Sequence, residues 1–287
     1  MDIRSAIKKR TSVRHYERLE VDEDILRDIV DAGFRALALD DNIFVNFHLI
    51  KQGSLVAQRL FPVTGTRLFF GSAPHFIIAT TEEKPLYMLN LGFKMEQMIL
   101  AATQKGLGTC WIGGLFNEER IRTLLEMDKD ERVIALTPIG YPDNSLYGHV
   151  AYNVIELAAM NRGKRKPLQH IAFSHYWNSP FQNEDDAILE ALECARLAPS
   201  WANTQPWHFL CCQDGIIAVV DTKIRYANNR NGNRYYRLDM GIAMSHFYLS
   251  VKETGSEGRW HTNDINVVQI AEKYGIPGGF EVLGVFK

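Results

Sequence analysis

Arginines and a serine alternate near the start of the chain, in the segment Arg10-Thr11-Ser12-Val13-Arg14. In an extended backbone, side chains at positions i, i+2 and i+4 point to one face. Arg10, Ser12 and Arg14 would then bring two guanidiniums and a hydroxyl together, and Arg binds phosphate through bidentate, charge-assisted hydrogen bonds. The pattern indicates a phosphate clamp or, as the alternative, a solvated basic N-terminus.

A second basic cluster, Arg162-Gly163-Lys164-Arg165-Lys166-Pro167, holds four cations within five residues. Such a run is typical of a surface linker. In a compact chain, Arg165 and Lys166 could instead meet the N-terminal arginines around one anion. The residues alone leave both interpretations open.

A loop rich in amides and indoles comes later, with the sequence Ala198-Pro199-Ser200-Trp201-Ala202-Asn203-Thr204-Gln205-Pro206-Trp207. Loops held by a rigid scaffold often carry function. Asn and Gln pair a donor with an acceptor, which suits the edge of a planar heterocycle, and Trp offers it a face. The alternative is a proline-rich turn with buried tryptophans.

A glycine-rich segment, Gly106-Leu107-Gly108-Thr109-Cys110-Trp111-Ile112-Gly113-Gly114, lies between two predicted helices. Its first glycines are expected to cap the preceding helix. Gly113 and Gly114 would let backbone N–H groups approach a ligand with no Cβ in the way. A tight turn with no ligand is the plainer reading.

An internal repeat relates the two parts of the chain. Residues 91–111 and 240–260 match at an offset of 149, with five identities at apolar or glycine positions. Upstream, His48 and His208 correspond at an offset of 160. We therefore expect two versions of one unit, predicted as domains 1–168 and 169–287 and joined between about Pro167 and Pro180.

The predicted elements mix helices and strands without strict βαβ alternation, which favours an α+β fold. Asn117 is expected to cap one helix, and Asn263-Asp264 to open its counterpart. For the first unit we expect helices 22–35, 86–105 and 118–126 and strands 44–51, 75–81 and 132–141. For the second we expect helices 185–196, 237–254 and 264–274 and strands 208–213, 216–221 and 280–286.

The composition is that of a globular protein, since 46% of the 287 residues are hydrophobic and 23% are charged. The net charge of −2 excludes a global basic field for nucleic acid or anionic membranes. The longest run without charged residues, 197–213, holds two prolines and several amides, so it cannot span a membrane.

The four cysteines show no CxxC spacing, and the chain opens without a signal peptide. We therefore expect four reduced thiols and a cytoplasmic protein. The nine histidines form no HExxH motif and no Cys/His cluster, so no structural metal is expected.

Three of these segments together resemble the FMN-dependent nitroreductase family: Arg-x-Ser-x-Arg, Pro-Ser-x-x-Asn-x-Gln-Pro-Trp and Gly-Leu-Gly-x-Cys-Trp-Ile-Gly-Gly. The resemblance covers most of the chain as two tandem copies, like nitroreductases built from two fused halves. It implies a mixed β-sheet flanked by helices, duplicated in one chain as a pseudo-dimer. In the ordinary family, FMN lies at the interface of two intertwined subunits.

The resemblance also implies the residues that bind FMN. Arg10, Ser12 and Arg14, with Arg165 and Lys166, would hold the phosphate. The loop would contact the flavin ring from across the pseudo-interface, and the glycine turn would place N–H groups near flavin N5. These ring residues are Pro199, Ser200, Trp201, Asn203 and Gln205 from the loop, and Ile112, Gly113 and Gly114 from the turn.

The complementary motifs are absent from the other half. Residues 39–43 stand where Pro-Ser-x-x-Asn is expected, with Ile43 opposite Asn203. Residues 170–174 replace the clamp, and Gly258-Arg259-Trp260-His261 replaces the segment 109–112. One flavin per chain follows, and the duplication makes a monomer the first expectation.

The resemblance implies a ping-pong oxidoreductase: NADH or NADPH gives hydride to FMN, and a nitroaromatic or quinone-like acceptor then enters the same space. No Ser/His/Asp or Cys/His constellation appears, and no catalytic side chain is assigned. The alternatives are a non-catalytic FMN-binding or flavin-sensing protein, flavin fragmentation or reductive dehalogenation on the same fold, and an interaction module without cofactor. Residues 225–234 are expected to form a loop, with an ordered lid as the alternative.

Overall fold

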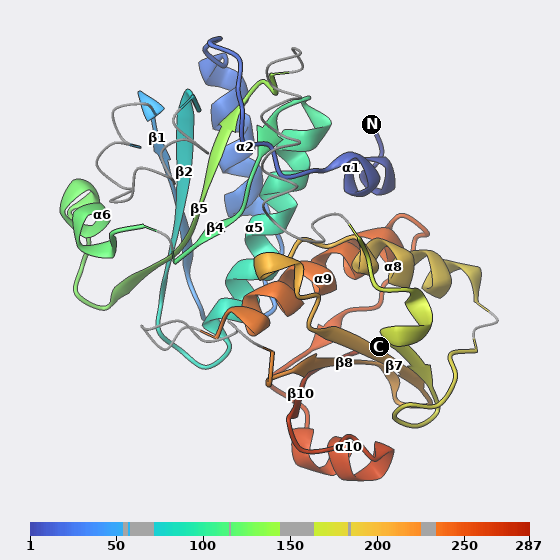
Figure 1. The fold of residues 1–287 in the computed structure, drawn as a ribbon. Coiled ribbons are helices and arrows are strands. Elements are labelled where there is room, and N and C mark those ends of the chain that lie inside the picture. The colour runs from blue at the N-terminus through green and yellow to red at the C-terminus, as the bar shows by residue number, and fades with distance from the viewer. Residues whose placement is uncertain (54–56, 58–71, 115, 144–163, 183–184, 225–233) are drawn as a thin grey trace.

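Two five-stranded sheets lie on either side of two long helices that pack against each other (Figure 1). The structure is a computed structural model that describes residues 1–53, 57, 72–114, 116–143, 164–182, 185–224 and 234–287. Residues 225–233 of the predicted loop, and Arg162 and Gly163 of the basic cluster, lie outside the described residues.

The first sheet has the strand order β1-β2-β5, and the short strands β3 and β4 both pair with β5. All of these pairs are antiparallel. Helices α2 and α5 cover its inner face and form one hydrophobic cluster with it. The elements are α2 (Glu23–Arg35), β1 (Val45–Ile50), β2 (His75–Glu82), α5 (Tyr87–Gln104), β3 (Gly108–Thr109), β4 (Ile112–Gly113), α6 (Glu118–Leu125) and β5 (Glu131–Gly140).

The second sheet repeats this arrangement. Its strands β7, β8, β10 and β9 lie in that order and correspond to β1, β2, β5 and β4 of the first sheet. From the long first helix of each half onward (α2 and α8), helices and strands follow one another in a similar order along the chain, which confirms the predicted duplication of an α+β unit. The elements are α8 (Asp186–Arg196), β7 (Trp207–Cys212), β8 (Gly215–Asp221), α9 (Tyr235–Lys252), β9 (Trp260–His261), α10 (Val267–Tyr274) and β10 (Phe280–Phe286).

Glycines at equivalent positions allow α5 and α9 to cross closely. A Cβ on Gly92 would lie 2.3 Å from the Leu238 carbonyl oxygen, and a Cβ on Gly241 would lie 2.1 Å from the Leu89 carbonyl oxygen. Gly92 and Gly241 are 149 residues apart, and so are Leu89 and Leu238, so the two contacts are related by a pseudo-two-fold axis. The helix-ending glycines behave alike, since Gly106 and Gly255 both have φ of +81°.

Apolar side chains of the two long helices pack against both sheets, and four methionines are among them. Met95 and Met98 pack with the first sheet, and Met240 and Met244 pack with the second; all four are fully buried. All four cysteines are free. No helix in the described residues is long and apolar enough to cross a membrane.

The structure differs from the predicted elements in three places. Helix α1 (Ile3–Lys9), which Asp2 caps, was not predicted, and it ends directly before the clamp segment that starts at Arg10. Helix α10 is capped by Asn266, because Asn263 and Asp264 bond instead to Asp40 and His261. Two short elements, η1 (Leu168–His170) and β6 (Ala172–Ser174), were not predicted, and β6 runs parallel to β7 at the sheet edge.

Candidate functional site

Arg10 leaves the end of α1 and buries its guanidinium between the two halves. Its side chain is 4% exposed, and its Nε lies 3.7 Å from Oε1 of Glu96 on α5. Within the described parts of the chain, this Nε has no hydrogen-bond partner. The Glu96 carboxylate also accepts hydrogen bonds from Trp111 Nε1 at 2.7 Å and meets His246 Nε2 of α9 at 2.8 Å. A buried polar network therefore joins the predicted clamp to both long helices.

The second basic cluster binds the amide-rich loop directly. Arg165 donates from Nη1 to Asn203 Oδ1 at 2.6 Å and from Nη2 to the Leu197 carbonyl at 3.1 Å. Lys166 donates its backbone N–H to Gln205 Oε1 at 2.8 Å and its Nζ to the Gln205 carbonyl at 2.9 Å. The two segments, 39 residues apart in the chain, form one side of the site.

Cations gather at this point. Burial, together with the nearby Arg10 and Arg196 guanidiniums, lowers the pKa of Arg165 to about 10. Burial also lowers the pKa of Lys166. Like charges held together in a buried place are stabilised by an anion, and the free Arg10 Nε offers it a donor. The residues present therefore fit a phosphate group.

The loop between α8 and β7 has an unusual backbone. Ala202, Asn203 and Gln205 all have positive φ, at 48°, 56° and 49°. Such conformations are costly for residues with a Cβ and persist where surrounding contacts impose them. The contacts here include Gln205 N–H to Ser200 Oγ at 2.9 Å and Asn203 Nδ2 to the Lys164 carbonyl at 3.0 Å. The loop is thus held in one shape.

Aromatic rings from the second half pack onto the glycine turn of the first. Trp201 stacks on Tyr235, with ring centroids 5.0 Å apart. A Cβ on Gly113 would lie 2.7 Å from the Tyr235 ring and 3.3 Å from the Trp201 ring. Gly114 has φ of +68°. Gly113 is therefore required for this close approach, and the indole of Trp201 is placed where a flat ring could contact it.

A buried carboxyl of α9 fastens this loop. Both oxygens of Asp239 lie 3.1 Å from the Trp201 backbone N–H. Asp239 is 4% exposed, and burial raises the pKa of its carboxyl well above the ordinary value. Asp239 and Tyr235 lie one turn apart on α9, so one face of this helix holds both the backbone and the ring of Trp201.

The contacts above bring Arg165 and Lys166 together with the loop and Gly113 together with Trp201, and the other predicted residues lie as follows. Ser12 forms a β-bridge with Thr109, which lays the clamp segment beside the glycine-rich strand β3. Ile112 is buried and pairs with Leu136 of β5. Pro199 is buried beneath the loop. Arg14 donates from Nη1 to the Ser12 carbonyl at 3.2 Å, while Arg10 turns toward Glu96.

Four polar residues of this network were not predicted: Glu96, Asp239, His246 and Arg196. Glu96 is among the buried residues of α5, most of which are apolar, and Asp239 and His246 are among the buried residues of α9. A charged residue on the apolar face of a helix requires a partner. The sequence therefore indicates that these residues need partners, but it does not show which residues those partners are.

The family model described as "Putative TM nitroreductase" matches residues 2–251. A protein of Methanothermobacter thermautotrophicus described as "Putative NADH dehydrogenase/NAD(P)H nitroreductase" is 27% identical over 150 residues, which are 50% of this chain and 78% of that protein. One half of this chain thus corresponds to most of that relative.

One solved structure that covers most of the chain has a similar fold. A nitroreductase structure from Thermotoga maritima matches with a TM-score of 0.57 and 21% identity, over 92% of this chain and 91% of that chain. A protein from Clostridium difficile described as an "FMN-dependent Nitroreductase" matches with a TM-score of 0.43 and 22% identity, over 49% of this chain and 87% of that chain.

Proposed function

This chain belongs to the "Putative TM nitroreductase" family, and we propose that it binds one FMN between its two halves and uses NADH or NADPH to reduce nitroaromatic or quinone-like acceptors. The observation that carries the proposal is the junction of Arg10, Arg165 and Asn203. Two guanidiniums from distant segments and the amide of a strained loop meet where Arg10 is buried and Arg165 and Asn203 are half-buried.

Each side of the site would hold a different part of the cofactor. Arg10, Arg165 and Lys166 would bind the phosphate, with Ser12 and Arg14 beside them. Trp201, Asn203 and the backbone of Gly113 and Gly114 would contact the ring. FMN supplies the redox chemistry when bound, accepting a hydride from the nicotinamide and passing two electrons to the acceptor.

The protein's own contribution would be binding, position and charge. Gly113 and Gly114 have no Cβ that could block access to their backbone N–H groups. These donors could therefore stabilise negative charge that develops on a ligand. Asp239 would keep the Trp201 backbone in place. Tyr235 would support the indole from the other face.

The visible absorption spectrum of the purified chain tests this function. We expect flavin bands that bleach on anaerobic addition of NADH or NADPH and return when a nitroaromatic or quinone is added. Bands that fail to bleach with either nucleotide would contradict the reductase and indicate a flavin-binding role. Absence of flavin, even after reconstitution with FMN, would contradict the cofactor assignment.

A further inference from the structure

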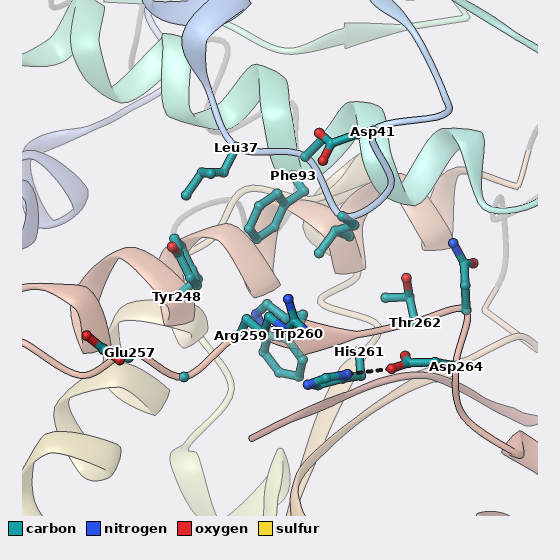
Figure 2. Close-up of a pocket in the computed structure, with 14 residues that line it drawn as sticks. Leu37, Asp41, Phe93, Tyr248, Glu257, Arg259, Trp260, His261, Thr262 and Asp264 are labelled. Atoms are coloured by element: carbon teal, nitrogen blue, oxygen red, sulfur yellow. Dashed lines mark hydrogen bonds and ion pairs between the residues drawn. The ribbon is translucent and has the colours of Figure 1, made fainter.

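A cavity of about 460 Å³ is lined by residues of both halves (Figure 2). Its walls are residues 37–39 and 41 of the first half and residues 257–264 of the second. Phe93 of α5 and Tyr248 of α9 complete it. Cavities of this size hold small organic molecules, which commonly occupy about 300–1,000 Å³.

This cavity occupies the position that the pseudo-two-fold symmetry makes equivalent to the proposed flavin site. At the offset of 149, residues 257–264 correspond to 108–115, and at the offset of 160, residues 37–41 correspond to 197–201. Its two walls are therefore the counterparts of the glycine turn and the amide-rich loop. Asn263 and Asp40 join them through a hydrogen bond of 2.7 Å from Nδ2 to Oδ2.

The groups that would hold a phosphorylated flavin are replaced here. The clamp counterpart, residues 170–174, forms η1 and β6, and Ile171 and Ala172 are fully buried in the core. Thr262 and Asn263 stand in place of the two glycines, and Ile43 stands in place of Asn203. The cavity lacks the phosphate clamp, and Phe93 and Tyr248 give it aromatic walls where the equivalent positions are Ile242 and Ile99.

Three aromatic residues form the apolar part of the cavity. The Phe93 and Tyr248 rings have centroids 5.7 Å apart, and both residues are buried. Trp260 lies below them in Figure 2. Its Nε1 is occupied by a 3.1 Å hydrogen bond to the Met244 carbonyl, so the indole offers the cavity only its apolar surface.

Arg259 supplies a positive charge at the cavity, where it also acts on the carboxylate of Asp264. Its backbone is fixed by two hydrogen bonds with Lys287, at 2.7 and 3.1 Å, and its guanidinium makes no ion pair within the described part of the chain. The neighbouring carboxylate of Asp264 is bound by His261 at 2.7 Å. Asp41 and Glu257 are exposed and lie at opposite ends of the cavity in Figure 2.

We propose that this cavity binds a flat aromatic compound that carries a carboxylate. The ring lies against Phe93 and Tyr248, and the carboxylate pairs with the guanidinium of Arg259, whose fork of donors matches the two oxygens. The site is separate from the proposed flavin site and does not depend on it.

Calorimetric titration with 2-naphthoate, on the full chain in saturating FMN, tests the proposal. We expect one naphthoate site per chain, and weaker binding of 2-naphthamide, which has a similar shape without the charge. Arg259→Gln should weaken naphthoate binding about tenfold or more and leave naphthamide binding unchanged. Tyr248→Leu should weaken both ligands.

Arg27→Gln is the matched control, because Arg27 is an exposed arginine of α2 outside the cavity lining. It should leave both affinities unchanged. No binding of naphthoate, or binding that Arg259→Gln does not weaken, would overturn the proposal. Arg14→Gln separates the two sites, because it should lower FMN affinity without changing naphthoate binding through Arg259.

Discussion

Glu96 is a single carboxylate that contacts groups from both halves of the chain. Trp111 and Arg10 approach it from the first half, and His246 approaches it from the second. A buried charge is tolerated only when it is paired and hydrogen-bonded. Removing it leaves its partners buried without a countercharge, which strongly destabilises the fold. Glu96 should therefore matter more for stability than any surface carboxylate.

We expect Glu96→Gln to lower the free energy of unfolding by about 3 kcal/mol, since Arg10 would lose its countercharge in a buried place. The control is Glu190→Gln, which breaks an exposed pair with Lys8 and should cost less than about 1 kcal/mol. Urea denaturation of both variants measures the difference. Equal midpoints would show that the buried network adds no stability.

Arg14→Gln tests the phosphate clamp with little disturbance, because among the described residues the Arg14 guanidinium donates only locally, to the Ser12 carbonyl. FMN affinity should fall about tenfold or more, the effect of losing a charge-assisted hydrogen bond. Riboflavin, which lacks the phosphate, should bind the variant as well as it binds the unaltered chain. Fluorescence titration with both flavins distinguishes these outcomes, and a parallel loss for riboflavin would contradict a phosphate role.

His208 should make stability depend on pH. It packs on β7 among Phe173, Trp177 and Phe280, and burial lowers its pKa from 6.5 to about 4, with Lys166 adding to the effect. As the pH falls below 6.5, His208 becomes protonated in the unfolded chain, whereas in the folded chain it stays neutral until about pH 4. Stability should therefore fall across this range as the pH falls, by about 2 kcal/mol after allowing for partial exposure.

The variant His208→Gln isolates this contribution. The difference in unfolding free energy between it and the unaltered chain should change between pH 6.5 and pH 4 and be constant above pH 7. Urea denaturation at several pH values gives that difference. A difference that stays constant over the whole range would mean that His208 titrates normally in the folded protein.

At the scale of elements, the crossing of α5 and α9 depends on two glycines. A side chain at Gly241 would meet the Leu89 carbonyl at 2.1 Å, which no rotamer can relieve. We expect Gly241→Ala to force the helices apart and to cost about 1–3 kcal/mol or more in urea denaturation. Gly278→Ala is the control, because its Cβ would meet nothing within 4 Å; it should be neutral or slightly stabilising.

The amide-rich loop shows a different kind of element, one whose shape comes from its neighbours. Its three residues with positive φ are not glycines, and their conformation is imposed by bonds to Ser200 and to the segment 164–166. In a turn without these bonds, the same residues would return to the usual negative φ values. The strain is found where the proposed ring contacts lie, as is common at binding sites.

At the scale of the whole molecule, two equivalent units carry two unequal sites. The cations and the strained loop lie together on one side of the pseudo-two-fold axis, and the other side has the aromatic cavity with Arg259. In a homodimer such differences are impossible, because both interfaces come from one sequence. Duplication within a chain removes that constraint.

We therefore expect one FMN for each 32.7 kDa chain, and a chain that sediments as a monomer. Flavin absorbance set against protein concentration gives the ratio, and analytical ultracentrifugation gives the mass. Two flavins per chain would show that the second cavity also accepts FMN. A stable dimer would show that the duplication has not removed the need for a partner chain.

The sequence by itself determined the elements and their duplication. Periodic apolar residues in 86–105 and 237–254, glycines at matching positions and strands of strong β-propensity were sufficient, because these patterns follow from local geometry. The three motifs likewise indicated which residues could bind a phosphate and a flat ring. Short elements such as β6 escaped prediction, because three residues carry no periodic signal.

Only the tertiary structure decided which polar groups meet. Nothing in the sequence pairs Arg165 with Asn203, or Glu96 with His246, because they are 38 and 150 residues apart and come together only when the two halves pack. The same holds for the second cavity, whose walls come from residues 37–41 and 257–264. Local propensity sets the elements, but the contacts between distant side chains depend on how the elements pack.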